Sequence, residues 1–113
     1  MRILLTLFLL LTPTVAAAQN CSEIRFARGA YSGDVVDVAP ANGLLCYTVG
    51  VGNNQTAYVE ILDGPNVAFT IPGVAEAVGY TQFRTRAGSY RIDVFQWSRA
   101  VQGQQFRMRV TVQ

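Results

Sequence analysis

Apolar and polar residues alternate with a period of two near the C-terminus, which is typical of β-strands with one buried face. The first apolar row consists of Tyr90, Ile92 and Val94. The second row ends the chain and consists of Phe106, Met108, Val110 and Val112. Arg91 and Asp93 lie on the opposite face of their strand, where cross-strand pairing with the row formed by Arg107 and Arg109 on the last strand is geometrically available.

Shorter apolar runs fill the rest of the chain after residue 22, and clusters of glycine, proline and asparagine separate them. This spacing is typical of an antiparallel sandwich rather than of helices. Besides the two C-terminal strands, we expect strands at 23–28, 32–38, 44–51, 56–62, 67–71 and 80–86, with a loop at 74–79. The pattern predicts an all-β fold, a small antiparallel β-sandwich of seven to eight strands with a jelly-roll-like arrangement.

Continued alternation after Val94 places Phe95 and Trp97 on the outer face, just before a connection at 98–105. The only tryptophan of the chain would then be exposed beside Arg99, and these two residue types dominate the energetics of protein interfaces. The alternative is that a β-bulge or a neighbouring loop buries Trp97. The sequence alone leaves both readings open.

The first 18 residues have the features of a secretory signal peptide. Arg2 gives a positive start, residues 3–11 are almost entirely apolar, and small residues at 16–18 suit cleavage after Ala18. The apolar run is shorter than the ~20 residues that a spanning helix needs. We therefore expect one domain at 19–113, which is periplasmic or secreted and is not held in a membrane after cleavage.

Cys21 and Cys46 are the only two cysteines. In a chain exported to an oxidising compartment, two cysteines are expected to form one disulfide. The sequence offers no neighbouring base or set of soft ligands that would suit a catalytic or metal-binding role. The pair is expected to staple the N-terminal strand to the sandwich.

Composition excludes several classes of function. The 113 residues contain no histidine, so triads, dyads and zinc sites that need an imidazole are absent. A net charge of +2 provides no clustered basic face for nucleic acid. Asp34 and Asp37 fall on opposite faces of one strand, which argues against a shared cation. We expect no enzyme activity, no cofactor, no metal and no nucleic-acid partner.

Several short motifs run in order through most of the mature chain, and together they resemble the periplasmic inhibitors of goose-type lysozyme. They are Phe26-Ala27-Arg28-Gly29, Tyr31-Ser32-Gly33, Tyr47-Thr48-Val49 with Gln55, and Gly88-Ser89-Tyr90-Arg91-Ile92-Asp93-Val94 through Arg99-Ala100. More broadly, the chain is similar to the β-sandwich of bacterial pre-peptidase C-terminal domains. In the inhibitor family an arginine after the late tyrosine strand is followed four residues on by a second. Arg99 matches the first, one residue late, and Gly103 occupies the second position.

The resemblance implies a non-catalytic protein that blocks a muramidase by inserting a loop into its substrate cleft. The expected partner is a protein, a goose-type lysozyme, and the expected binding residues are Trp97, Ser98, Arg99 and Gln102 of loop 97–103, with Tyr31 and Ser32 adjacent. The alternatives are a carbohydrate-binding or adhesion module, in which Trp97 or Tyr80 stacks on sugar rings, and a structural accessory domain. The residues do not specify an oligomeric state.

Overall fold

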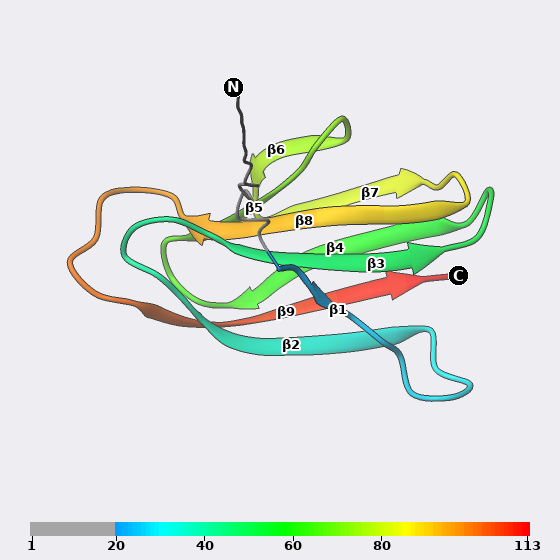
Figure 1. Ribbon diagram of the computed structural model, residues 1–113, viewed down its shortest axis with the longest axis horizontal. Helices are drawn as coiled ribbons and strands as arrows, with labels where there is room; N and C mark the ends of the chain where they lie inside the picture. Colours follow the sequence, from blue (N-terminus) through cyan, green and yellow to red (C-terminus); the bar gives the residue numbers. More distant parts are fainter. Residues whose placement is uncertain (1–19) are drawn as a thin grey trace, which may run out of the picture.

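The structure, a computed structural model, describes residues 20–113, so the expected signal peptide at 1–18 lies outside the described residues. Nine strands and no helix form this part of the chain (Figure 1). The strands are β1 (Ser22–Glu23), β2 (Ser32–Ala39), β3 (Leu45–Val51), β4 (Thr56–Asp63), β5 (Val67–Ile71), β6 (Ala75–Val78), β7 (Tyr80–Arg84), β8 (Gly88–Gln96) and β9 (Gln104–Val112). Within residues 20–113, no helical segment of a length and apolarity suited to crossing a membrane occurs.

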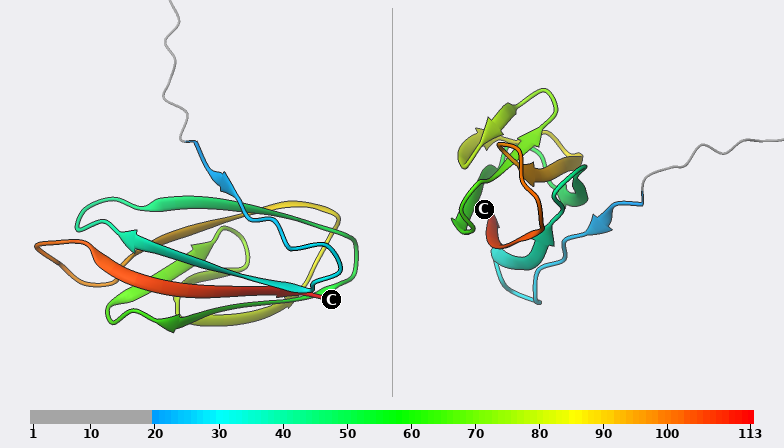
Figure 2. Two further views of the ribbon diagram at one scale, coloured as in Figure 1. Left: turned by 90° about the horizontal axis from the view of Figure 1, so that it is seen from below. Right: turned by 90° about the vertical axis from the view of Figure 1, so that its left-hand side faces the viewer.

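The strands form two sheets, with the orders β1-β3-β8-β5-β6 and β2-β9-β4-β7. The chain passes from one sheet to the other at every connection except the β5–β6 hairpin. Strands that follow one another in sequence therefore mostly face each other across the core. The predicted all-β sandwich is confirmed, and Figure 2 shows the two layers from below and from one end.

The core lies between the sheets and contains the apolar rows that the alternation predicted. On β8, Ile92 and Val94 are fully buried, and Tyr90 packs against the core half-buried. The row of β9 is also buried and consists of Phe106, Met108, Val110 and Val112. Since burying one such side chain contributes about 1.5–3 kcal/mol, these two central strands fix which face of each sheet points inward.

Two strand predictions were wrong in their bounds. The first strand has only two residues, since after Glu23 the chain leaves the sheet towards the turn at Arg28 and Gly29. The segment 74–79, expected to be a loop, contains β6, which pairs with β5 through the turn at 72–74. Pro72 and Gly73 lie in this turn and bend the chain into the hairpin. The count is therefore nine among the described residues.

The cross-strand pairing that the pattern allowed between the two C-terminal strands is not available in the structure. Because β8 and β9 belong to different sheets, the outer face of one is turned away from the outer face of the other. Arg91 instead bonds Asp93 on its own strand, with 2.7 Å between Nε and Oδ1. Arg107 and Arg109 both bond Asp34 on β2, at 2.7 Å and 2.8 Å.

The disulfide between Cys21 and Cys46 is present, as expected. It joins the start of the described chain to β3, and β1 then runs parallel to β3 with Ser22 opposite Tyr47. The amide of Ile24 donates to the carbonyl of Thr48 at 2.8 Å, so the main chain continues the attachment for one more residue. The disulfide thus holds a strand that has too few ladder bonds to stay in place alone.

A side-chain hydrogen bond between β3 and β2 links the two sheets. The buried phenol of Tyr47 on β3 donates to Oδ2 of Asp37 on β2 at 2.7 Å. Burial, together with the hydrogen bond to Asp37, raises the pKa of the Tyr47 phenol well above its usual range. The phenol therefore remains a proton donor. Because a buried donor needs an acceptor, this hydrogen bond favours the observed position of β3 relative to β2.

The disulfide can be tested by replacing both cysteines with serine. The chain-entropy treatment gives a loss of about 3 to 4 kcal/mol in the free energy of unfolding for a loop of this length. Urea denaturation of the Cys21→Ser/Cys46→Ser variant should show a correspondingly lower midpoint, and wild type treated with a reductant should match it. A midpoint equal to that of the oxidised wild type would contradict a stabilising role.

The second prediction concerns acid. Hydrogen bonds from Arg109 and Arg107 hold the pKa of Asp34 at about 2, below the ordinary value of 3.8. A carboxyl with a lowered folded-state pKa adds stability above its unfolded pKa and loses it as the pH falls through the folded value. Asp34→Asn should therefore be less stable than wild type at pH 7, and this difference should shrink between about pH 4 and pH 2.

Thermal melts of both proteins across this range measure the difference. Glu76→Gln is the control, because Glu76 is exposed and forms no ion pair with another of residues 20–113. A gap between wild type and Asp34→Asn that stays constant down to pH 2 would show that the ion pairs do not contribute.

Candidate partner-binding site

The connection between β8 and β9 projects beyond the neighbouring turns at one end of the sandwich (Figures 1 and 2). We call residues 97–103 the finger. Trp97 is 64% exposed and Val101 is 95% exposed. Ser98, Arg99, Gln102 and Gly103 are exposed as well. Most side chains of the finger therefore point to solvent.

Trp97 is exposed because the alternation of β8 continues to the end of the strand. Val94 faces the core and Gln96 takes the next inward position, so Trp97 falls on the outer side. The amide of Trp97 donates to the carbonyl of Asn66 at 2.6 Å, which ties this backbone position to the β4–β5 turn. Of the two arrangements that the sequence left open, the structure shows the one in which Trp97 is exposed.

The side chain of Asn66 fastens the start of the finger. Its Nδ2 donates to Oε1 of Gln96 and to the carbonyl of Ser98, both at 3.0 Å. Its Oδ1 accepts from the amide of Ser98 at 3.0 Å and from the Ser98 hydroxyl at 2.7 Å. Asn66 has φ of 67°, a left-handed conformation that asparagine tolerates better than most residues.

The side chain of Gln96 fastens the end of the finger to the other sheet. Its Nε2 lies 2.9 Å from the carbonyl of Gln102, and 3.2 Å and 3.3 Å from the carbonyls of Ala39 and Pro40. Together, the side chains of Asn66 and Gln96 form what we call the amide clamp. It connects three turns: the one after β2, the one before β5, and the finger.

Sequence reasoning missed the amide clamp. Asn66 stands in an Asp-Gly-Pro-Asn turn, where turn geometry accounts for an asparagine, and Gln96 is a polar residue at an inward position of a strand. That polar residue in an apolar row was the available signal, because an amide turned towards the core needs hydrogen-bond partners.

Arg99 carries a charge that the fold does not use. Its guanidinium has no ion pair and no hydrogen bond with any of residues 20–113. Arg99 is also the only charged residue between Asp93 and Arg107. An exposed guanidinium on a fastened loop is free to bond a carboxylate on another molecule.

Tyr31 and Ser32 do not lie beside the finger, so that prediction was wrong. Strand β2 is antiparallel to β9, with Ser32 opposite Thr111 and Ala39 opposite Gln104. Ala39 at the finger end of β2 is seven positions further along the strand than Ser32, or roughly 23 Å away. Tyr31 is 65% exposed, but at the opposite end of the sandwich. The remaining predicted binding residues, Trp97, Ser98, Arg99 and Gln102, share one loop.

Gly103 has a packing reason for being glycine. A Cβ atom at this position would come 2.6 Å from Cγ1 of Val38 and 3.3 Å from the carbonyl oxygen of Ala39. Since Val38 is β-branched and stiff, a larger residue would push the backbone of the finger away from β2. The finger of this chain thus carries one arginine where the inhibitor pattern has two.

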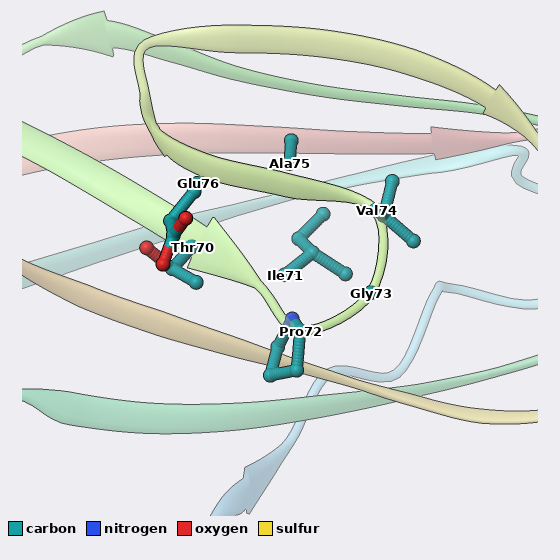
Figure 3. Close-up of a pocket in the computed structure, with 7 residues that line it drawn as sticks. All are labelled: Thr70, Ile71, Pro72, Gly73, Val74, Ala75 and Glu76. Atoms are coloured by element: carbon teal, nitrogen blue, oxygen red, sulfur yellow. The ribbon is translucent and has the colours of Figure 1, made fainter.

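One surface hollow, of about 290 Å³, is lined by consecutive residues 70–76 of the β5–β6 hairpin, and Glu76 is its only carboxylate (Figure 3). Glycoside hydrolysis uses a pair of carboxylates. Residues 20–113 also contain no cluster of three side chains suited to hold a metal ion.

The sequence matches no protein-family model, and no curated protein matches it significantly. Solved structures do match. PliG of Aeromonas hydrophila, a periplasmic inhibitor of g-type lysozyme, has 26% sequence identity and a TM-score of 0.70, over 82% of this chain and 96% of that chain. PliG of Salmonella Typhimurium, also a periplasmic inhibitor of g-type lysozyme, has 15% sequence identity and a TM-score of 0.66, over 85% of this chain and 100% of that chain.

A pre-peptidase C-terminal domain of a Bacillus anthracis collagenase also matches, with 12% identity and a TM-score of 0.54, over 88% of this chain and 100% of that domain. Both resemblances that the sequence motifs indicated are therefore confirmed in structure. The fold of the chain is the sandwich of the periplasmic g-type lysozyme inhibitors, with the collagenase domain as a more distant neighbour.

Proposed function

We propose that this chain is an exported, non-catalytic inhibitor of a g-type lysozyme and that the finger enters the substrate cleft of that enzyme. The observation that carries the proposal is the exposed finger, which the amide clamp fastens on both sides while Arg99 keeps its charge available. The structural likeness to periplasmic inhibitors of g-type lysozyme supports the same reading. A signal peptide at 1–18 would deliver the chain to the periplasm or beyond.

The chemistry of a muramidase cleft suits this finger. Enzymes that cleave glycosidic bonds carry carboxylates at the reacting position, and a guanidinium can bond one of them with two parallel hydrogen bonds. Trp97 adds a large, flat apolar surface at the start of the finger, which would occupy space that a sugar ring needs. A fastened loop also loses little conformational freedom on binding, which favours affinity.

A carbohydrate-binding module is the second candidate, because exposed aromatic rings can stack on sugars. Trp97 is 64% exposed and Tyr80 is 52% exposed on β7. Binding to a glycan array that Trp97→Ala abolishes, without any effect on lysozyme, would select this function. The third reading, a purely structural accessory domain, expected Trp97 to be buried, and its exposure removes that support.

The main test is inhibition of cell-wall lysis by a purified g-type lysozyme. Wild type should inhibit lysis, and Arg99→Ala should raise the inhibition constant by about 30-fold, the effect of losing a buried interfacial charge contact of about 2 kcal/mol. Arg28→Ala is the matched control, since Arg28 is exposed near the opposite end of the sandwich. Undiminished lysis at micromolar wild-type protein would reject the function.

Asn66→Asp tests whether fastening of the finger matters for inhibition. The substitution keeps the shape but replaces the Nδ2 donor with an oxygen, so the bonds to Oε1 of Gln96 and to the carbonyl of Ser98 are lost, while those that Oδ1 accepts from Ser98 remain. Two lost hydrogen bonds predict an inhibition constant raised by about tenfold. Amide hydrogen exchange at residues 97–102 should accelerate in the same variant.

Asn53→Asp provides the control for this change, because Asn53 is an exposed turn residue at the other end of the sandwich. Equal inhibition by the two variants, with unchanged exchange in the finger, would mean that the amide clamp has no part in binding.

A further inference from the structure

The end of the sandwich opposite the finger collects positive charge. Strands β3, β7 and β9 end there, and strands β2, β4 and β8 begin there (Figure 1). We call residues 26–32, 51–56, 84–88 and 112–113 the far end. They include three arginines, Arg28, Arg84 and Arg86, and neither aspartate nor glutamate. The rest of residues 20–113 contains five arginines and seven acidic residues. The positive charge of the described chain is therefore concentrated at this end.

The three guanidiniums of the far end belong to exposed residues and carry charges that the fold does not neutralise. Arg28, Arg84 and Arg86 form no ion pair with another of residues 20–113. Arg84 donates only to the neutral hydroxyl of Thr56, at 3.1 Å. The carboxyl group of Gln113 also lies here, and its oxygen accepts from the amide of Thr56 at 2.8 Å. Three guanidiniums against one carboxyl group leave an excess of positive charge for an anionic partner.

The arginines are spread across the far end rather than gathered around one point. Arg28 precedes β2 and Arg84 ends β7, and these two strands are the opposite edges of one sheet. Three strand spacings separate the edges, or roughly 14 Å. Arg86 lies in the turn that leads from β7 to β8 in the other sheet. One small anion does not reach all three guanidiniums, whereas an extended anionic surface does.

An aromatic ring accompanies the arginines. Tyr31 is 65% exposed, and together with Phe26 and Val112 it lines a hollow of about 480 Å³ at the far end. Tyrosine combines an apolar ring with a polar hydroxyl, and it is enriched where a membrane meets water. Clustered cations bind anionic lipid headgroups. The far end thus has both kinds of side chain that a surface of anionic lipids attracts.

We propose that the far end adsorbs to the surface of a membrane that contains anionic lipids, with the three arginines at the headgroups and Tyr31 at the interface. Such a contact is electrostatic and needs no segment that crosses the bilayer. The inference goes beyond lysozyme inhibition and does not depend on it, because the finger lies at the other end of the strands. A chain adsorbed in this way directs its finger away from the lipid, towards soluble molecules.

Sedimentation with vesicles tests the proposal. Wild type should sediment with vesicles of phosphatidylcholine and phosphatidylglycerol in equal amounts, but not with phosphatidylcholine alone. Salt at about 0.5 M should release the protein, because it screens exposed charges. Each arginine near an anionic surface contributes about fivefold to the partition coefficient, so Arg28→Gln/Arg84→Gln/Arg86→Gln should lower it by about 100-fold.

The matched control is Arg25→Gln/Arg99→Gln/Arg107→Gln, which removes the same number of positive charges outside the far end. It should bind the vesicles within about threefold of wild type, since screening limits the reach of distant charges. Circular dichroism and melting temperature check that both triple variants fold. Trp97, the only tryptophan, reports the orientation, and its emission should stay unchanged on binding because the finger points away from the lipid.

Three results would overturn the inference. The first is an equal loss of binding in both triple variants, which would mean that net charge rather than the far end binds. The second is a blue shift of Trp97 emission, which would place the finger at the lipid. The third is a wild type that does not sediment with anionic vesicles. If that protein nevertheless elutes from heparin only at raised salt, the far end binds a soluble polyanion instead. The lysis assay measures inhibition separately, so none of these results decides the proposed function.

Discussion

The shape of the finger, and with it the proposed binding site, depends on two side-chain amides. A seven-residue connection between separate sheets would ordinarily be free to move, because no ladder of main-chain bonds runs through it. At the start of the finger, Asn66 bonds Gln96 and Ser98, the two neighbours of Trp97. At its end, Gln96 bonds the carbonyl of Gln102. Both amides have donors and acceptors in one planar group, so each can serve several backbone atoms at once. This lets an exposed loop keep one shape without any buried core of its own.

The clamp works because the topology brings three turns to the same end of the sandwich. Strands β2, β4 and β8 all end there, and the chain switches sheets after each of them. The turns before β3 and β5 therefore flank the finger from the two sides, within reach of Gln96 and Asn66. Tyr31 shows the reverse case. It precedes β2, which pairs with β9, the strand that follows the finger. Because the two strands are antiparallel, Tyr31 lies near the end of β9 that is far from the finger.

The period-two pattern was sufficient to predict the layers of the fold, because alternation depends only on strand geometry. It did not decide the direction of Trp97, since a bulge or a neighbouring loop at the end of a strand can reverse the alternation. Pairing partners were harder, and Arg91 with Asp93 shows why. The local sequence does not indicate which sheet a strand joins. Two consecutive strands with complementary charges on their outer faces therefore suggested pairing within one sheet, although they lie in different sheets. The amide clamp joins residues about 30 positions apart, Asn66 with Gln96. Such contacts follow from the three-dimensional crossing of turns, and they leave no periodic signal in the sequence.

Among residues 20–113, the charges divide into those that the fold uses and those that it leaves without a partner, and Arg99 is the charge of the second kind that lies on the finger. Asp34 bonds two arginines on the sheet face, and Arg91 bonds its neighbour Asp93, so these guanidiniums are engaged within the fold. Arg99 stands on the finger apart from all of them, among residues that carry no charge. An unused guanidinium adds nothing to folding, and its desolvation on binding must be offset by a carboxylate of the partner. The finger is thus suited to a cleft with an acidic centre, and poorly suited to a neutral or basic surface.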